Sequence, residues 1–171
     1  MNRTPAFPGF LLRSPAKQGR KPVSPLRIGT DLVWIPEIAQ SLEQFGERYL
    51  NRVFSAQEQA DCSGEAPRRV ASLAARFAAK EAMMKVLCPA ADTALPWHSI
   101  EIVRQTDGHP EIVLHGAACI LAQQWKIRHL SLSMSHEKDY ASATVVALCH
   151  ESGKNHESGF CVVNPHRYRH Q

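Results

Sequence analysis

Two carboxylates and two lysines stand out in this sequence because they interrupt apolar stretches. Asp31 lies within a strand-like run, where carboxylates are disfavoured, although a turn residue or a helix-cap acceptor would also be acidic there. Glu81 lies between Lys80 and Lys85 in a segment otherwise dominated by Ala, Leu, Phe and Met. Mg²⁺ binds through one or two carboxylates and leaves positions for water and substrate phosphate, whose charge lysines neutralise. A strand carboxylate and a helix carboxylate together are therefore compatible with a metal–phosphate site.

Helical spacing arranges the charged residues of the second segment in two stripes. Phe77, Glu81 and Lys85 are four residues apart and share one face of a helix. Arg76 and Lys80 form a neighbouring stripe at the same spacing. Charged groups near a buried surface need partners or a ligand. From spacing alone, however, an exposed Glu81–Lys85 ion pair that contributes about a few tenths of a kcal/mol is the simpler interpretation.

Two downstream segments place further polar residues near the ends of predicted strands. Residues 131–136 alternate serine with apolar residues, so the apolar set is expected to face the core while Ser135 faces away from it. His136 lies at the strand end, where it could meet a ligand or simply be a surface residue. Gly108 and Pro110 belong to a hairpin turn, which is the ordinary interpretation of that segment.

Hydrophobic periodicity and breaker residues predict the elements that position these side chains. Pro67 suits the first turn of a long helix that Pro89 would end, and Ser55 with Glu58 forms a capping-box signature. In order, the sequence predicts a strand at 26–33, helices at 35–50, after Ser55 and at 67–87, strands at 99–104 and 111–114, a helix at 116–125, and strands at 129–135 and 141–148. The predicted fold class is α+β, with a small, mostly antiparallel sheet packed with a long central helix and shorter helices.

The charge distribution separates the predicted domain, residues 26–150, from its flanks. Residues 1–25 carry five Lys or Arg, five Pro and no acid, which predicts a disordered basic leader. Residues 151–171 lack periodicity and predict a flexible tail. The domain itself contains twelve Lys or Arg against fourteen Asp or Glu. The basic charge therefore lies in the flanks, and the absence of a basic stripe interleaved with aromatic residues argues against nucleic-acid binding.

The cysteines and the apolar runs bear on the compartment. The five cysteines, an odd number, show no Cys-x-x-Cys spacing, which is typical of reduced thiols in a cytosolic protein. No apolar run reaches the length of a membrane span, and Pro8 and Gly9 break the apolar stretch at 7–12, which makes it a poor signal-peptide core. These patterns predict a cytoplasmic protein that is not inserted in a membrane.

Several motifs follow one another in a fixed order along the predicted domain. They are Gly29-x-Asp31, then Arg76-Phe77-Ala78-Ala79-Lys80-Glu81-Ala82-x-x-Lys85, then Gly108-x-Pro110, then Ser133-x-Ser135-His136 followed by Tyr140-Ala141-x-Ala143. This combination resembles the holo-acyl-carrier-protein synthase group of the 4′-phosphopantetheinyl transferases, over roughly residues 26–150. The resemblance implies transfer of the phosphopantetheine arm of coenzyme A to a serine of an acyl carrier protein, with release of adenosine 3′,5′-bisphosphate.

The resemblance also implies roles for individual residues. Asp31 and Glu81 would bind Mg²⁺, and Glu81 and Lys85 would act in catalysis. The residues that would contact the phosphates or the adenine end of coenzyme A are Arg76, Lys80, Lys85, Gly108, Pro110, Ser135 and His136. The incoming serine must lose a proton, and the sequence leaves open whether Glu81 or a water accepts it. Small members of the group are homotrimers with sites at subunit interfaces, so one site would draw residues from two chains.

Three departures from the family pattern concern the binding of coenzyme A and of the carrier protein. Cys88 and Pro89 replace a Gly-rich loop, and Pro89 has no N–H to donate to a phosphate. The helix after Asp31 carries Glu37 early, where the family usually presents arginines to an acidic carrier protein. His109 stands where the family commonly has lysine. These changes leave a second hypothesis open, a catalytically inert coenzyme A- or nucleotide-binding module of the same fold.

Overall fold

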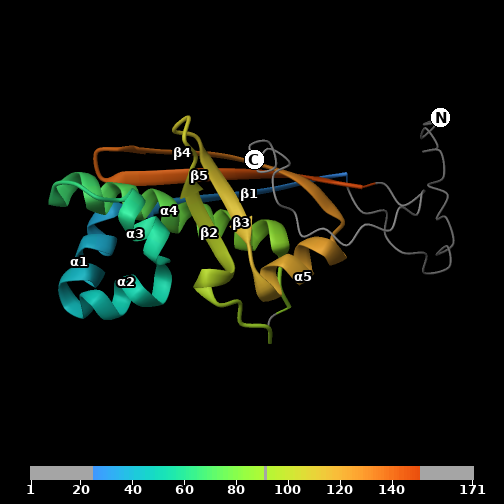
Figure 1. The fold of residues 1–171 in the computed structure, drawn as a ribbon, viewed down its shortest axis with the longest axis horizontal. Helices are drawn as coiled ribbons and strands as arrows, with labels where there is room; N and C mark the ends of the chain where they lie inside the picture. The colour runs from blue at the N-terminus through green and yellow to red at the C-terminus, as the bar shows by residue number, and fades with distance from the viewer. Residues whose placement is uncertain (1–24, 91, 151–171) are drawn as a thin grey trace, which may run out of the picture.

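A long helix lies along one face of a three-stranded sheet in the computed structural model, which describes residues 25–90 and 92–150 (Figure 1). The strands are β1 (Leu26–Trp34), β4 (Ile127–Glu137) and β5 (Tyr140–Cys149), and the helix is α4 (Ala66–Leu87). Neighbouring strands pair antiparallel in the order β1-β5-β4. The predicted leader (residues 1–25) and tail (residues 151–171) lie outside the described residues, apart from Pro25.

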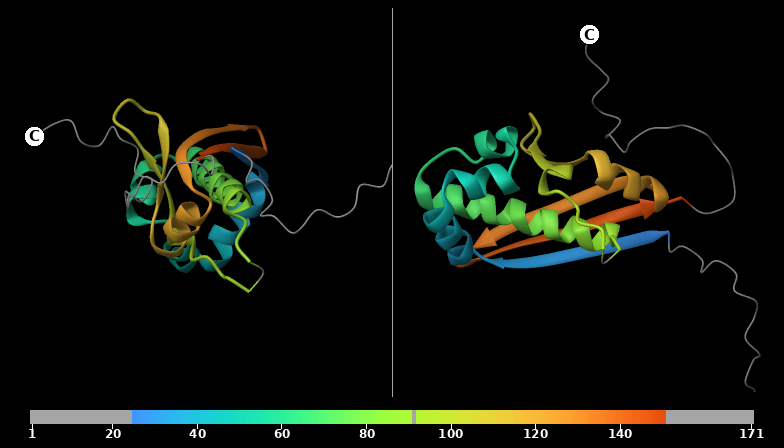
Figure 2. Two further views of the ribbon diagram at one scale, coloured as in Figure 1. Left: turned by 90° about the vertical axis from the view of Figure 1, so that its right-hand side faces the viewer. Right: turned by 90° about the horizontal axis from the view of Figure 1, so that it is seen from below.

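Shorter elements pack near the two ends of α4 (Figure 2). Three helices gather around its N-terminal half: α1 (Ile35–Phe45), α2 (Glu47–Val53) and α3 (Ala56–Asp61). A 3-10 helix, η1 (Trp97–Ser99), leads into a separate antiparallel hairpin of β2 (Ile100–Arg104) and β3 (Pro110–Leu114), and α5 (Gly116–Gln124) follows. The predicted α+β class is confirmed, with the strands divided between two antiparallel sheets.

Local signals account for most of the element boundaries. Ser55 and Glu58 form the predicted capping box, in which each side chain accepts a hydrogen bond from the backbone N–H of the other residue. Cys88 adopts a left-handed conformation and ends α4 just before Pro89. The prediction of one helix at 35–50 is wrong, because Gly46, with a φ of 52°, separates α1 from α2.

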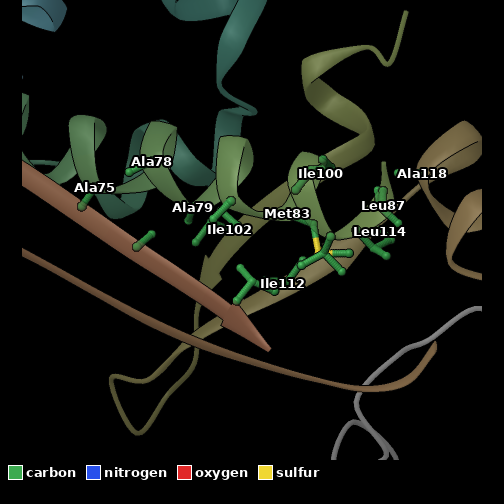
Figure 3. Packing of buried hydrophobic residues seen from close by; sticks show 14 of the residues in the cluster. Ala75, Ala78, Ala79, Met83, Leu87, Ile100, Ile102, Ile112, Leu114 and Ala118 are labelled. Atoms are coloured by element: carbon green, nitrogen blue, oxygen red, sulfur yellow. The ribbon is translucent and has the colours of Figure 1, made fainter. Parts of the chain in front are cut away.

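Helix α4 is buried through a mixture of small and large side chains. Its buried alanines include Ala74, Ala75, Ala78, Ala79 and Ala82. Figure 3 shows Met83 and Leu87 of α4 among side chains of β2 and β3, namely Ile100, Ile102, Ile112 and Leu114. One helix therefore packs against both sheets and holds them in a common core.

A close approach between α4 and β1 occurs at Gly29. A Cβ atom on this residue would overlap the carbonyl oxygen of Ala82 and lie 3.0 Å from its carbonyl carbon, and 3.1 Å from Cγ2 of Val86. The absence of a side chain at Gly29 therefore lets the strand and the helix backbones touch. This contact brings the strand that carries Asp31 against the helix that carries Glu81.

Two predictions about the compartment can be compared with the described residues. Cys62, Cys88 and Cys149 are free thiols, in agreement with the prediction of reduced cysteines for these three residues. Within residues 25–90 and 92–150, no helix combines the length and the apolar composition needed to cross a membrane. The cytoplasmic location stays a prediction.

We expect Gly29→Ala to lower the free energy of unfolding by about 1–3 kcal/mol, because the added methyl group must push α4 away from β1. Denaturant unfolding followed by circular dichroism would show this as a lower midpoint. Ser133→Ala is the control, since it introduces alanine at an exposed strand position and should change stability by less than about 0.5 kcal/mol. Equal midpoints for the two variants would show that the close approach is not needed.

Candidate functional site

Asp31 and Glu81 come together where β1 passes α4. Asp31 follows Gly29 by two residues and therefore points to the same side of the strand, toward the helix. Glu81 directly precedes Ala82, the residue that Gly29 touches. Both carboxylates line the same groove. Burial, and then the charge of Asp31, raise the pKa of Glu81, while Lys85 partly opposes this shift.

Lys85 pairs with Asp31 rather than with the glutamate on its own helix. Its Nζ donates to Asp31 Oδ1 at 2.8 Å and to the carbonyl oxygen of Thr30 at 2.7 Å. Within the described part of the chain, the Glu81 carboxylate has no hydrogen-bond or ion-pair partner. The simpler interpretation of the sequence, a Glu81–Lys85 ion pair, is therefore wrong. Lys85 instead links α4 to β1 through Asp31, and among the described residues the Glu81 carboxylate is left unpaired.

The groove beside the two carboxylates has a volume of about 710 Å³ and mixes apolar walls with charged edges. The rings of Phe77 and Trp97 line it and stack with their centroids 4.9 Å apart. Glu37 from α1 and two arginines from α2, Arg48 and Arg52, also line it, and all three are exposed. A molecule that reaches the carboxylates through this groove would meet an apolar surface and charges of both signs.

A second cavity gathers residues that belong to different sequence motifs. Five predicted contact residues line it, from α4, from the β2–β3 turn, from the start of β3 and from β4: Arg76, Gly108, Pro110, Ser135 and His136. Arg68 and Arg104 line it too, although the sequence analysis did not single them out. Arg68 precedes Arg76 by eight residues on α4, so extending the helical stripe backward by two turns would have found it. The Asp61 carboxylate also lines this cavity and pairs with Arg76 at 3.6 Å, so the guanidinium groups of Arg68 and Arg104 are the cations left to attract an anionic ligand.

Lys80 lines neither cavity, because its ammonium is fully buried between α4, α3, η1 and β2. It lies 2.9 Å from Glu58 Oε2 and donates hydrogen bonds to the carbonyl oxygens of Trp97 and Ile100. Burial lowers the pKa of Lys80, while the Glu58 carboxylate opposes that shift. The three N–H donors of Lys80 are all engaged within the chain, which gives no support to the prediction that Lys80 contacts coenzyme A. Lys80 is a structural cation that ties α3, η1 and β2 to α4.

The structure thus divides the predicted site residues into two groups. Asp31 and Glu81 line the groove, and Lys85 is bonded to Asp31. The group around Arg76 lies at the second cavity, and the two cavities share no lining residue. Glu81 and Arg76 are five positions apart on α4, which separates them by about 140° around the helix axis. Within one chain, the carboxylates and the arginine cavity therefore lie on different faces of the same helix.

The oxygen donors at the groove fit a hard divalent cation such as Mg²⁺. Asp31 and Glu81 come from different elements and reach one space, and Mg²⁺ in proteins commonly takes one or two carboxylates with waters and substrate oxygens. In the described part of the chain, no cluster of three or more His, Cys, Asp or Glu side chains could hold a metal. The other positions around a cation here would therefore be taken by water or by a substrate.

Comparisons with known proteins point to one family. A family model described as the 4′-phosphopantetheinyl transferase superfamily matches residues 27–145. The holo-[acyl-carrier-protein] synthase of Koribacter versatilis is 41% identical over 121 residues, which cover 71% of this chain and 96% of the relative. The enzyme of the same name from Gloeobacter violaceus is 43% identical over 122 residues, which cover 71% of this chain and 92% of the relative.

Solved structures of the same family are similar in fold. The ACPS–CoA complex of Chronobacterium ammoniagenes has a TM-score of 0.63 and 29% identity, and the match covers 74% of this chain and 98% of that chain. The Helicobacter pylori holo-[acyl-carrier-protein] synthase in complex with coenzyme A has a TM-score of 0.60 and 30% identity, over 70% of this chain and 98% of that chain. The similarity therefore extends over almost the whole length of these structures.

We expect Lys80→Met to destabilise the fold by about 3–5 kcal/mol, because it leaves Glu58 buried without its cation. Glu58→Gln in the Lys80→Met background should recover part of this loss, since a neutral amide is less costly to bury than a carboxylate. Denaturation of the wild type, the two single variants and the double variant measures the coupling between the two residues. If the change in unfolding free energy of the double variant equals the sum of the changes of the two single variants, the two residues are not coupled, which would contradict the buried ion pair.

Proposed function

We propose that this chain, which belongs to the 4′-phosphopantetheinyl transferase superfamily, transfers the phosphopantetheine arm of coenzyme A to a serine of an acyl carrier protein, with Mg²⁺ as the metal. The family predicted from the sequence motifs is confirmed, and the chain is an enzyme of this superfamily. The observation that carries the specific proposal is the meeting of Asp31 and Glu81 at one groove. A cytoplasmic location is part of the same proposal.

In this proposal, Asp31 and Glu81 hold the metal, which when bound would neutralise charge on the pyrophosphate of coenzyme A. Lys85 adds a second cation at the same place. The serine oxygen bonds to the phosphorus that carries the pantetheine arm, the phosphoanhydride bond breaks, and adenosine 3′,5′-bisphosphate leaves. Such a transfer needs mainly positioning and charge neutralisation from the protein. Either Glu81 or a water accepts the serine proton.

The second cavity would hold the other end of coenzyme A. Arg68, Arg76 and Arg104 line it, and although Arg76 is paired with Asp61, the other two guanidinium groups suit the remaining phosphate of the nucleotide. Gly108 has a φ of 90° and lies in the turn. Because glycine has no side chain, this position leaves room for a base. His109 is exposed on the same turn and its backbone N–H donates to Asp107, so the turn keeps its shape without a lysine.

A site completed by two copies of the chain would account for the separation of the two cavities, and we propose a homotrimer. The outer face of the three-stranded sheet supports this, because Ile28 is 60% exposed and Leu32 is 65% exposed. Trp34 and Tyr140, which are paired across β1 and β5, extend this apolar surface. Since Leu32 and Trp34 also line the groove, a second copy packed on this face would border the carboxylates.

The enzymatic proposal predicts a mass gain of one phosphopantetheine arm on an apo acyl carrier protein incubated with the chain, coenzyme A and Mg²⁺. Glu81→Gln should lower the rate by at least about a hundredfold while the protein stays folded, because it removes one of two anionic ligands. Mass spectrometry of the carrier measures both results. If coenzyme A binds but several apo carriers gain no mass, the chain is the inert binding module instead.

The oligomer proposal predicts that Ile28→Glu dissociates the trimer and abolishes transfer, because a carboxylate cannot be buried in an apolar interface without a partner. Light scattering after size-exclusion chromatography gives the mass of the assembly. Ile120→Glu makes the same substitution at an exposed position of α5 and should leave both assembly and activity unchanged. A wild-type chain that transfers the arm as a monomer would contradict a shared site.

A further inference from the structure

The ammonium of Lys85 is bound to Asp31, one of the two carboxylates that the proposed metal would need. Its Nζ lies 2.8 Å from Asp31 Oδ1 and 2.7 Å from the carbonyl oxygen of Thr30. Glu81, one helical turn earlier, is half-buried and is left without such a contact among the described residues. The chain therefore places its own cation at the site, on the helix that supplies the second ligand.

We propose that Lys85 competes with Mg²⁺ for Asp31, and that its ammonium becomes available to the pyrophosphate of coenzyme A only when Asp31 turns to the metal. Lys85 is then a positioning residue in the metal-free enzyme and a phosphate contact in the loaded one. This inference rests on the proposed function, specifically on Asp31 and Glu81 as the metal ligands. It adds an order of events, in which Asp31 binds the metal before Lys85 contacts the pyrophosphate.

The exposure of Lys85 allows this exchange of partners. Its side chain is 52% exposed, and a lysine has a flexible four-carbon stem, so the ammonium can swing away without disturbing the core. Lys80, five positions earlier on α4, is fully buried among three acceptors and has no such freedom. The two lysines of the motif therefore differ physically, since one is fixed in the core and the other can change its partner.

Electrostatics makes the competition measurable. An ammonium about 5 Å from a divalent cation in a water-like environment weakens binding of that cation by about fifteenfold without salt, and screening at physiological ionic strength reduces this to about fivefold. Releasing Lys85 from Asp31 removes this repulsion and at the same time frees a cation for phosphate. Metal and coenzyme A should therefore strengthen each other's binding, because coupling between two ligands is reciprocal.

Mn²⁺ binding in the absence of coenzyme A and carrier protein tests the first half of this proposal. We expect Lys85→Met, or Lys85→Gln as a second variant, to bind Mn²⁺ about fivefold more tightly than the wild type in calorimetric or paramagnetic-resonance titrations at physiological salt. Asp31→Asn should bind Mn²⁺ more weakly, because it removes an anionic ligand. Circular dichroism confirms that each variant is folded.

Lys126→Met is the matched control, because it removes the same charge at the far end of the sheet. Lys126 directly precedes Ile127, which pairs with Cys149, whereas Asp31 pairs with Ala143. Six residues of β5 separate the two places, a distance of about 20 Å, which is about two and a half Debye lengths at physiological salt. We expect this variant to bind Mn²⁺ like the wild type, within about twofold.

Coenzyme A titrations with and without Mn²⁺ test the second half. The enhancement of coenzyme A binding by Mn²⁺ should be at least about fivefold smaller in Lys85→Met than in the wild type. Equal or weaker Mn²⁺ binding by Lys85→Met, an undiminished enhancement, or no Mn²⁺ binding by any variant would each overturn the proposal. Transfer to the carrier by the wild type is measured separately, so these failures are distinguishable from failure of the proposed function.

Discussion

The contact between Gly29 and the backbone of Ala82 is the constraint on which the site depends. Because no side chain stands between them, β1 and α4 approach closely enough for their backbones to touch. Asp31 lies two residues further along the strand, and Glu81 lies one residue before Ala82, so the contact carries the two carboxylates into one groove. The arrangement of the two carboxylates is therefore a consequence of how α4 packs on β1. Asp31 and Glu81 both depend on the contact between Gly29 and Ala82 for their positions.

Helix α4 has a structural role on one side and a chemical role on another. Its buried side holds the core together, and a different side carries Glu81 to the groove. Its alanines allow close packing, and Lys80 is held by Glu58 in the core, where a buried ion pair ties α3 to the long helix. Glu81, the next residue, points toward the groove instead. A rotation of about 100° per residue is what allows adjacent charged residues to serve such different environments. A rigid helix anchored on one side thus presents reactive groups on the other.

Much of the fold followed from local pattern. The capping box at Ser55, the long helix ending before Pro89 and the alternation in β4 are confirmed, because each depends on residues near one another in sequence. The break at Gly46 was missed, since a helical pattern of apolar residues continues across it and only the backbone conformation shows the interruption. Arg104 was also missed, because a single arginine at a strand end carries no signal until another element packs beside it.

By itself, the sequence determined the order of the motifs, the family they indicate, and which charged residues share a helical stripe, since periodicity follows from backbone geometry alone. Only the tertiary structure decided which partner each charge has. Lys85 meets Asp31, 54 residues away, and Lys80 meets a glutamate of another helix, whereas local spacing favoured Glu81 as the partner of Lys85. The reason is physical: a charge pairs with the nearest opposite charge in space, and packing brings distant segments nearer than one turn of the same helix.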